Sequence, residues 1–287
     1  MIKLIAADVD GTLLNSHHEI SEENCRLIRA AQQRGIRFAI ASGRMYGDIR
    51  ILLERYGLRC ECVTMNGAEY FAADGSCLEG IYFSREKAQE IYELLRKERN
   101  FAVEIYTDHG CYTADSRFKT FHGLMKRART FRPGLGALKN IFYVLKNDHL
   151  RKMHYFKNLQ ELWESDIQVA KFITFGDDAD DVQKLRRKAE HIPEIAVSAS
   201  FRTNIEINAA AATKGAILRK IADRAGIRED EVMVIGDGSN DLSMFQAFPT
   251  HAAAMANGVR EIREAAGFIT ASNDEDGVAR AIERALA

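Results

Sequence analysis

Short apolar runs alternate with amphipathic segments towards both ends of the chain. The runs are too continuous for strands with one face in water, and such runs are typical of parallel strands buried on both faces. We predict strands at residues 3–7, 37–41, 62–65, 232–235, 252–255 and 268–270. The alternation of strands with helices predicts an α/β fold, a Rossmann-like parallel sheet core with helices on both faces.

Polar residues and glycines mark the ends of the helices between these strands. Ser21 can cap a helix that ends near Gly35, and Gly57 can end the next one. Thr213 can cap a helix that begins at Lys214. The helix that begins at Lys214 therefore has an ammonium group in its first turn.

The middle of the chain begins with a different pattern. Residues 69–83 predict a β-hairpin that turns at residues 73–75, and Ser84 can cap an amphipathic helix directly after it. An antiparallel pair followed by a helix does not continue the parallel alternation. A second domain therefore begins near this point.

Mixed helix and strand patterns continue from there to about residue 208. The strands expected in this part are residues 140–146, 169–175 and 195–200. A stretch of about 125 residues has the size of a domain. We predict a core of residues 1–83 plus 209–287, interrupted by an inserted α+β domain of residues 84–208.

Composition narrows the class of protein. The chain has 287 residues, 46% of them hydrophobic, and a formal net charge of −1. This composition excludes a disordered or fibrous chain, and near-neutrality argues against nucleic acid as a partner. No apolar run approaches the ~18 residues of a membrane span, and the odd, scattered set of five cysteines fits reduced thiols. We expect a cytoplasmic protein with no membrane partner.

Polar side chains follow four of the predicted strands at the point where each strand ends. These positions are Asp8, Asp10 and Thr12, then Ser42, Gly43 and Arg44, then Asn66, and finally Asp237, Asn240 and Asp241. In an open parallel sheet, ligands bind outside the carboxyl ends of the strands. The four clusters are therefore expected to converge on one crevice.

The expected crevice is rich in carboxylates. Residues two apart in a strand point to the same side, about 6.5 to 7 Å apart, so Asp8 and Asp10 can both face it. Together with Asp237 they call for a cation, and carboxylates without sulfur or imidazole favour Mg²⁺, which shares its ligand shell with phosphate. A single aspartate would more often be a turn or cap residue. Clusters on several neighbouring strand ends make that explanation weak, and they predict a small phosphorylated metabolite as the partner.

Four motifs resemble, in chain order, those of the haloacid dehalogenase superfamily. They are DVDGTLL at residues 8–14, SGR at residues 42–44, KG at residues 214–215 and GDGSND at residues 236–241. Asn66, Asn257 and the tail at residues 272–279 are similar to the Cof-type phosphatase branch. By position and length, the insert resembles the large α/β (type IIB-like) cap of that branch.

The resemblance implies a Mg²⁺-dependent phosphatase that acts on small phosphomonoesters, with sugar phosphates as the expected class. Asp8 would be the nucleophile that forms an aspartyl-phosphate, and Asp10 would be the general acid and base. Asp8, Asp10 through its backbone carbonyl, and Asp237 would hold Mg²⁺, with Asp241 in support.

The resemblance also implies which residues bind the substrate. Ser42, the Gly43 N–H, Lys214 and Asn240 would hold the phosphoryl oxygens. Thr12 would orient the first loop. Arg44 and Asn66 would contact the leaving group or lie nearer the cap.

Two alternatives use the same groups. A phosphomutase on a similar core and cap would return the phosphoryl group to the sugar, and a phospho-accepting signalling module also gathers aspartates, Mg²⁺ and a lysine on a parallel sheet. A second carboxylate at Asp10 and an insert of domain size argue against the signalling module. A further acidic run at residues 177–181 could suggest a cation site, but acids at a helix start also satisfy the helix dipole, and we favour that interpretation.

Overall fold

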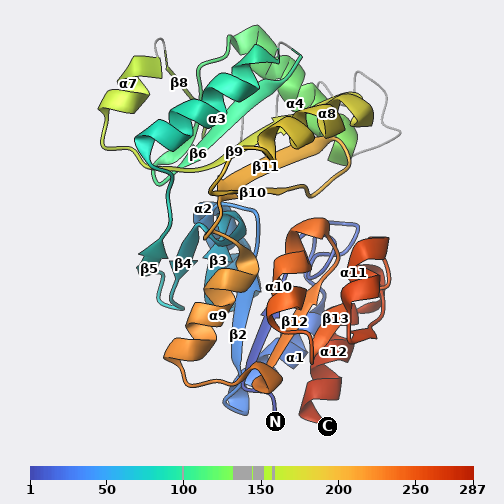
Figure 1. Cartoon of the computed structure of the whole chain (residues 1–287). Helices are drawn as coiled ribbons and strands as arrows, with labels where there is room; N and C mark the ends of the chain where they lie inside the picture. Colours follow the sequence, from blue (N-terminus) through green and yellow to red (C-terminus); the bar gives the residue numbers. More distant parts are fainter. Residues whose placement is uncertain (99, 132–143, 145–151, 157–158) are drawn as a thin grey trace. The chain divides into compact units, whose positions relative to one another are not determined.

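The computed structural model describes the chain except residues 99, 132–143, 145–151 and 157–158. The chain forms two compact units. Unit 1 comprises Met1–Ile81 and Ala212–Ala287, and unit 2 comprises Tyr82–Ala211. Figure 1 shows that the two ends of the chain both belong to unit 1.

Both unit boundaries differ slightly from the predicted domain limits. Phe83 belongs with unit 2, because its N–H donates to the carbonyl of Val169 (2.9 Å) and its ring packs on the core of that unit. A limit before residue 209 would cut strand β11 (Asn204–Ala209). The role of unit 2 as a cap is a separate matter and stays a prediction.

Unit 1 is built on an eight-stranded sheet, counted over the described residues, in the order β14-β13-β12-β1-β2-β3-β4-β5. Its strands are β1 (Leu4–Ala7), β2 (Arg37–Ala41), β3 (Glu61–Thr64), β4 (Glu69–Phe71), β5 (Cys77–Gly80), β12 (Val232–Gly236), β13 (Ala252–Ala254) and β14 (Phe268–Ile269). The strands from β14 to β3 pair in parallel, and β4 runs antiparallel to both of its neighbours, β3 and β5. The six predicted parallel strands and the hairpin are confirmed.

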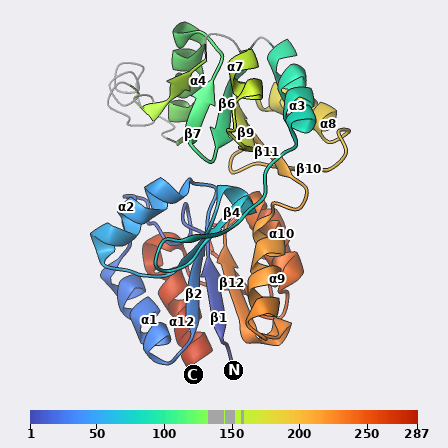
Figure 2. The same cartoon turned by 90° about the vertical axis from the view of Figure 1, so that its left-hand side faces the viewer.

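Alternate residues of the buried strands point into two separate cores. Ile5 of β1 packs on one face with Ile28 and Ile282, from helices α1 (Glu22–Gln33) and α12 (Gly277–Leu286). Leu4 packs on the other face with Leu218 of α9 (Lys214–Arg224) and Phe245 of α10 (Leu242–Ala247). Figure 2 shows helices on both sides of the sheet. The α/β fold class is confirmed.

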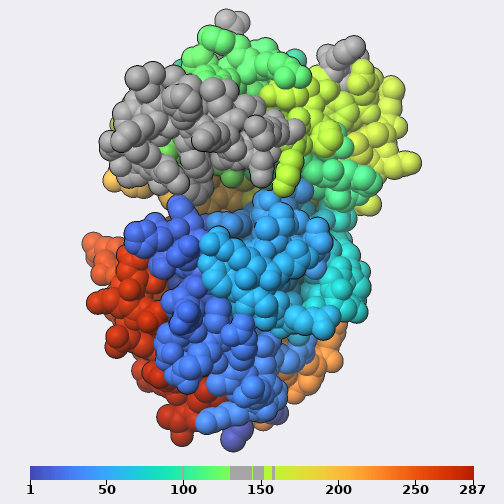
Figure 3. Space-filling view, turned by 180° about the vertical axis from the view of Figure 1, so that it is seen from behind, coloured from blue at the N-terminus to red at the C-terminus, as the bar shows by residue number. Residues whose placement is uncertain are grey.

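Two further helices complete unit 1. α2 (Tyr46–Tyr56) lies on the same face as α1, and α11 (Arg260–Ala265) lies on the face of α9. Figure 3 shows the first of these faces, where the N-terminal segment (blue) lies beside the C-terminal segment (red). These two segments are fastened by a hydrogen bond from the Ala279 N–H to Asn24 Oδ1 (2.8 Å).

The predicted helix ends have the expected local chemistry. The hydroxyl oxygens of Ser21 and Thr213 accept hydrogen bonds from backbone N–H groups in the first turns of α1 and α9. Gly57 ends α2 in the left-handed conformation, at φ 59°. Each cap fixes where a helix starts or stops, and thereby fixes the loop beside it.

Unit 2 is built on a six-stranded sheet, counted over the described residues, in the order β10-β11-β9-β6-β7-β8. The new elements are β6 (Ala102–Thr107), β7 (Gly110–Thr113), β8 (His154–Tyr155), β9 (Val169–Phe175), β10 (Ile195–Ser198), α3 (Arg85–Lys97), α4 (Arg117–Phe131), α7 (Leu159–Glu164) and α8 (Ala179–Ala189). The sheet is mainly antiparallel, as an α+β unit requires. Strands predicted at 169–175 and 195–200 are present. The strand predicted at 140–146 lies outside the described residues apart from Val144, which is helical and not extended.

The acidic run at residues 177–181 begins α8. Asp178 caps this helix and accepts a hydrogen bond from the Asp180 N–H (2.7 Å). Asp177 forms ion pairs with Lys126 (3.3 Å) and Arg129 (3.3 Å). The helix-start interpretation is confirmed.

Within the part of the chain that the structure describes, none of the helices has the length and apolar character that a bilayer crossing requires.

The first turn of α9 packs tightly on α10, and this contact yields a prediction about stability. A Cβ at Gly215 would overlap the carbonyl oxygen of Ser243, whereas a Cβ at Gly47, also the second residue of a helix, meets nothing within 4 Å. We expect Gly215→Ala to lower the free energy of unfolding by about 1–3 kcal/mol through overpacking. The matched variant Gly47→Ala should be neutral or stabilise by up to about 1 kcal/mol. Urea unfolding of both variants measures the difference, and equal stabilities would contradict this account.

Candidate functional site

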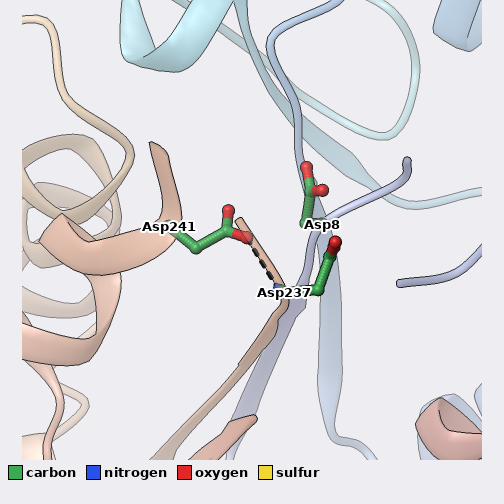
Figure 4. Close-up of side chains that lie close together, drawn as sticks. All are labelled: Asp8, Asp237 and Asp241. Carbon is green, nitrogen blue, oxygen red and sulfur yellow. Dashed lines mark hydrogen bonds between the residues drawn. The ribbon is translucent and has the colours of Figure 1, made fainter. Parts of the chain in front are cut away.

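Three carboxylates from the loops after β1 and β12 meet at one edge of the unit 1 sheet. Asp8 follows β1 directly and is only 4% exposed. Asp237 follows β12, and Asp241 ends the 3₁₀ turn η3 (Ser239–Asp241). Because β1 and β12 are neighbours in register, one oxygen of each carboxylate lies within 4.8 Å of the others (Figure 4).

Lys214 ties two of these carboxylates together. Its Nζ donates to Asp8 Oδ1 (2.7 Å) and to Asp241 Oδ1 (2.6 Å), and its side chain is fully buried. Burial alone would lower the pKa of this ammonium, but the charges of Asp241 and Asp8 more than offset that effect and raise the pKa above its usual value. Lys214 therefore carries a fixed positive charge beside Asp8.

The surrounding acids carry more negative charge than this single ammonium offsets. Burial, and then the charge of Asp241, hold the pKa of Asp8 well above its usual value, although Lys214 opposes the shift. The same two causes raise the pKa of Asp237 to about 7, against the hydrogen bond from Thr12. A hard divalent cation among these carboxylates would reduce the repulsion between their negative charges. Their oxygen atoms are ligands that fit Mg²⁺.

Asp241 holds the loop after β12 in place. While its Oδ1 accepts from Lys214, its Oδ2 accepts hydrogen bonds from the N–H groups of Asp237 (3.0 Å) and Gly238 (3.0 Å). Both oxygens thus have protein donors. This arrangement suits the supporting position that the resemblance implies for Asp241, rather than a direct ligand.

Thr12 and Gly11 connect the loop after β1 to Asp237. The Thr12 hydroxyl donates to Asp237 Oδ1 (2.6 Å). Gly11 adopts φ 80°, and the Asp237 carboxylate lies so close to its α carbon that any Cβ there would clash. Only glycine meets both constraints without strain.

Asp10 faces a different partner from Asp8. Its two oxygens accept from Arg44 Nε (2.8 Å) and Nη2 (2.5 Å), in a bidentate pair whose side chains are each about one-third exposed. Sequence reasoning placed both residues at the crevice but did not foresee this ion pair. The pair forms because β1 and β2 are adjacent, which brings their following loops together.

The loops after β2 and β3 are joined to each other by hydrogen bonds. The Ser42 carbonyl accepts from the Asn66 N–H (3.0 Å), and the Ser42 hydroxyl oxygen accepts from the Arg44 N–H (3.2 Å). Asn66 is buried at φ 62° in the turn η1 (Met65–Gly67), a conformation that asparagine tolerates better than most residues. Gly43 lies between Ser42 and Arg44, and the last predicted residue, Asn240, lies in η3.

The structure adds two residues to which the sequence assigned no chemistry. The side-chain amide of Asn257 donates to the Gly11 carbonyl (2.8 Å), and its Oδ1 accepts from the Asn273 N–H (2.9 Å). Asn257 follows β13 closely. The rule applied to the other loops, that polar residues after a parallel strand face the ligand edge, would have included it.

Comparison with known proteins agrees with this geometry. The family model described as "haloacid dehalogenase-like hydrolase" matches residues 5–282. The chain is 30% identical to "Phosphatase YwpJ" of Bacillus subtilis, over 99% of this chain and 100% of that protein. It is 31% identical to the B. subtilis protein named "5-amino-6-(5-phospho-D-ribitylamino)uracil phosphatase YwtE", over 99% of this chain and 98% of the relative.

Solved structures show the same fold. A haloacid dehalogenase-like hydrolase from B. subtilis superposes with a TM-score of 0.86 at 29% identity, over 98% of this chain and 99% of that one. The subclass IIB sugar phosphatase BT4131 superposes with a TM-score of 0.74 over 98% of both chains, and at 22% identity this likeness concerns the fold alone. The resemblance noted in the sequence is confirmed: the chain belongs to the haloacid dehalogenase-like hydrolases and is a phosphatase, a phosphoric monoester hydrolase acting on small phosphate substrates.

Proposed function

We propose that this phosphatase is Mg²⁺-dependent, that it acts on sugar phosphates and related small phosphomonoesters, and that it works through an aspartyl-phosphate on Asp8. The observation that carries the proposal is the setting of Asp8. It is a buried carboxylate at a strand end, oriented by Lys214 and set close to Asp237. A nucleophile, a fixed cation and an acidic pair in one place are the parts that phosphoryl transfer needs.

We assign Asp8, Asp237 and the backbone carbonyl of Asp10 as the Mg²⁺ ligands. Bound there, the ion would supply positive charge that offsets the negative charges of Asp8 and the phosphate. Asp241 and Thr12 support the assignment, because they hold the backbone and the carboxylate of Asp237 in a defined orientation.

Asp8 would act as the nucleophile. One of its oxygens attacks phosphorus, and the bond between phosphorus and the leaving oxygen breaks. Asp10 donates a proton to that oxygen. Asp10 then takes a proton from a water molecule, whose oxygen attacks the aspartyl-phosphate, and the bond from phosphorus to Asp8 breaks to release phosphate.

The ion pair with Arg44 engages both oxygens of Asp10. Arg44 donates to them through Nε (2.8 Å) and Nη2 (2.5 Å). To act as an acid in the first step, Asp10 must leave Arg44 and turn to the leaving oxygen. Catalytic contacts of this kind often form only in the substrate complex.

The phosphoryl oxygens would be held by Ser42, the Gly43 N–H, Lys214 and Asn240. An ammonium has three N–H donors, of which Asp8 and Asp241 accept two, and we assign the third to the phosphate. Since the transition state spreads charge over these oxygens, donors fixed in advance supply much of the acceleration.

The substrate class is supported by one relative in particular. The B. subtilis protein at 31% identity is named for a phosphorylated ribitylamino uracil, a small metabolite with a sugar-derived chain. We infer a substrate of comparable kind, with unit 2 as the cap that selects it. Names of relatives favour release of free phosphate over the transfer that a phosphomutase performs.

Removal of the nucleophile should abolish turnover. We expect Asp8→Asn to lower kcat for 4-nitrophenyl phosphate by roughly a thousandfold or more, because the amide cannot form the covalent intermediate. Circular dichroism should show an unchanged fold. Asp230→Asn is the matched control, as Asp230 is an exposed residue paired with Arg228. Hydrolysis at the wild-type rate by Asp8→Asn would contradict the assignment.

The loss of activity on metal removal should be reversible. We expect a chelator to abolish phosphate release from wild-type enzyme and added Mg²⁺ to restore it, because the acidic cluster needs a cation to accept a phosphate anion. A panel of sugar phosphates measures both metal dependence and substrate class, and analysis of the sugar product detects isomerisation. Activity that is unaffected by chelation would refute the metal assignment.

Loss of Asp10 should affect the two half-reactions differently. With 4-nitrophenyl phosphate, whose leaving group needs no proton, Asp10→Asn should release about one equivalent of nitrophenol per enzyme in a burst and then turn over slowly. With a sugar phosphate the same variant should show no burst. Rapid-quench kinetics separate the phases, and steady turnover of both substrates at wild-type rates would exclude Asp10 as acid and base.

A further inference from the structure

The loop after β13, residues 255–259, contacts both acidic loops of unit 1. The Val259 N–H donates to the Asp237 carbonyl (2.9 Å), and the Met255 N–H donates to the Gly236 carbonyl (3.0 Å). On its other side, the Asn257 amide donates to the Gly11 carbonyl (2.8 Å). One short loop therefore fixes the backbone at Asp237 and also the loop that begins at Asp8.

The hydrogen bond to Gly11 also affects Asp237 by a second route, through Thr12. The Gly11 carbonyl and the Thr12 N–H belong to one planar peptide group, so a bond to that carbonyl restricts the orientation of Thr12. From the other side, this peptide is held by a long hydrogen bond from the Thr12 N–H to the Val9 carbonyl (3.4 Å). The Thr12 hydroxyl in turn donates to Asp237 Oδ1 (2.6 Å).

Asn257 is itself fixed by the C-terminal tail. Its Oδ1 accepts from the backbone N–H of Asn273, the first residue of the turn η4 (Asn273–Glu275), at 2.9 Å. This acceptor contact orients the amide, so that its NH₂ group faces Gly11. The Asn273 side chain donates to the Leu14 carbonyl (2.9 Å), and Leu14 forms a β-bridge with Asp10 in the same loop.

We propose that Asn257 is a positioning residue that sets the orientation of the Asp237 carboxylate through Gly11 and Thr12. The inference rests on the proposed Mg²⁺ site. It assigns the tail at residues 272–277 a part in that site as well, because the tail holds Asn257. Asn257 need not touch substrate or metal.

The test compares two neutral truncations that each remove a side-chain amide bonded to a backbone carbonyl. Asn257→Ala loses the bond to Gly11 and the acceptor for the Asn273 N–H, and Gln32→Ala loses the bond to the Arg59 carbonyl (2.7 Å), outside the loops of the site. For Asn257→Ala we expect the Kd of Mg²⁺, measured by calorimetry without substrate, to rise about five- to tenfold. We expect kcat to fall by a similar factor and the KM for the phosphate ester to change little. Gln32→Ala should bind Mg²⁺ and turn over like wild type, and the melting temperatures of the two variants should be similar.

A second pair separates the donor from the acceptor of Asn257. Asn257→Asp still accepts from Asn273 but cannot donate to Gly11, and Asn273→Asp adds the same charge at the neighbouring contact. Weaker Mg²⁺ binding by Asn257→Asp than by Asn273→Asp supports the proposal. Equal Mg²⁺ affinities within either pair would overturn it, because a general loss of loop stability would then explain the data. Wild-type enzyme that binds no Mg²⁺ in the same calorimeter would instead refute the proposed metal site.

Discussion

The site depends on one buried ammonium shared between two buried carboxylates. Removing charges from water is costly unless each has a partner, and Lys214 provides that partner for Asp8 and Asp241 at once. Without this ammonium, the buried carboxylates of Asp8 and Asp241 would lack an ion-pair partner. Its position is set by the first turn of α9, which Thr213 caps and which Gly215 allows to pack against α10.

The parallel sheet brings the remaining groups to Lys214. β12, β1, β2 and β3 lie side by side, so the loops that follow them open on the same edge, although they come from opposite ends of the chain. Two apolar cores, one on each face, hold these strands in register. Placing the acids at the ends of paired strands fixes the distances between them before a substrate binds, as the proposed mechanism requires.

Contacts between loops give each acid a different environment. Asp8 is buried against an ammonium, Asp237 is held by a threonine and a backbone N–H, and Asp10 is partly exposed in a pair with Arg44. In the proposed mechanism, these surroundings rather than the residue type distinguish the nucleophile from the proton carrier and from the metal ligand. The family relationship identifies the reaction as phosphate hydrolysis, and the local contacts support the role proposed for each acid.

Sequence alone was sufficient for the strands of the unit 1 sheet and for the acids that follow them, whereas β6, β7, β8 and β11 of unit 2 were not predicted. Continuous apolar runs identified the parallel strands, helix caps such as Ser21 and Thr213 were readable because they act locally, and the polar residues at the strand ends indicated the site. Partners within the site came only from the tertiary structure. The pairs Asp10–Arg44 and Asn257–Gly11 join loops that are distant in the chain, and which loops meet is decided by strand order and packing. Hydrophobic periodicity and helix capping depend on residues that are close in sequence. A hydrogen bond between loops at the sheet edge depends on the tertiary structure of the whole unit.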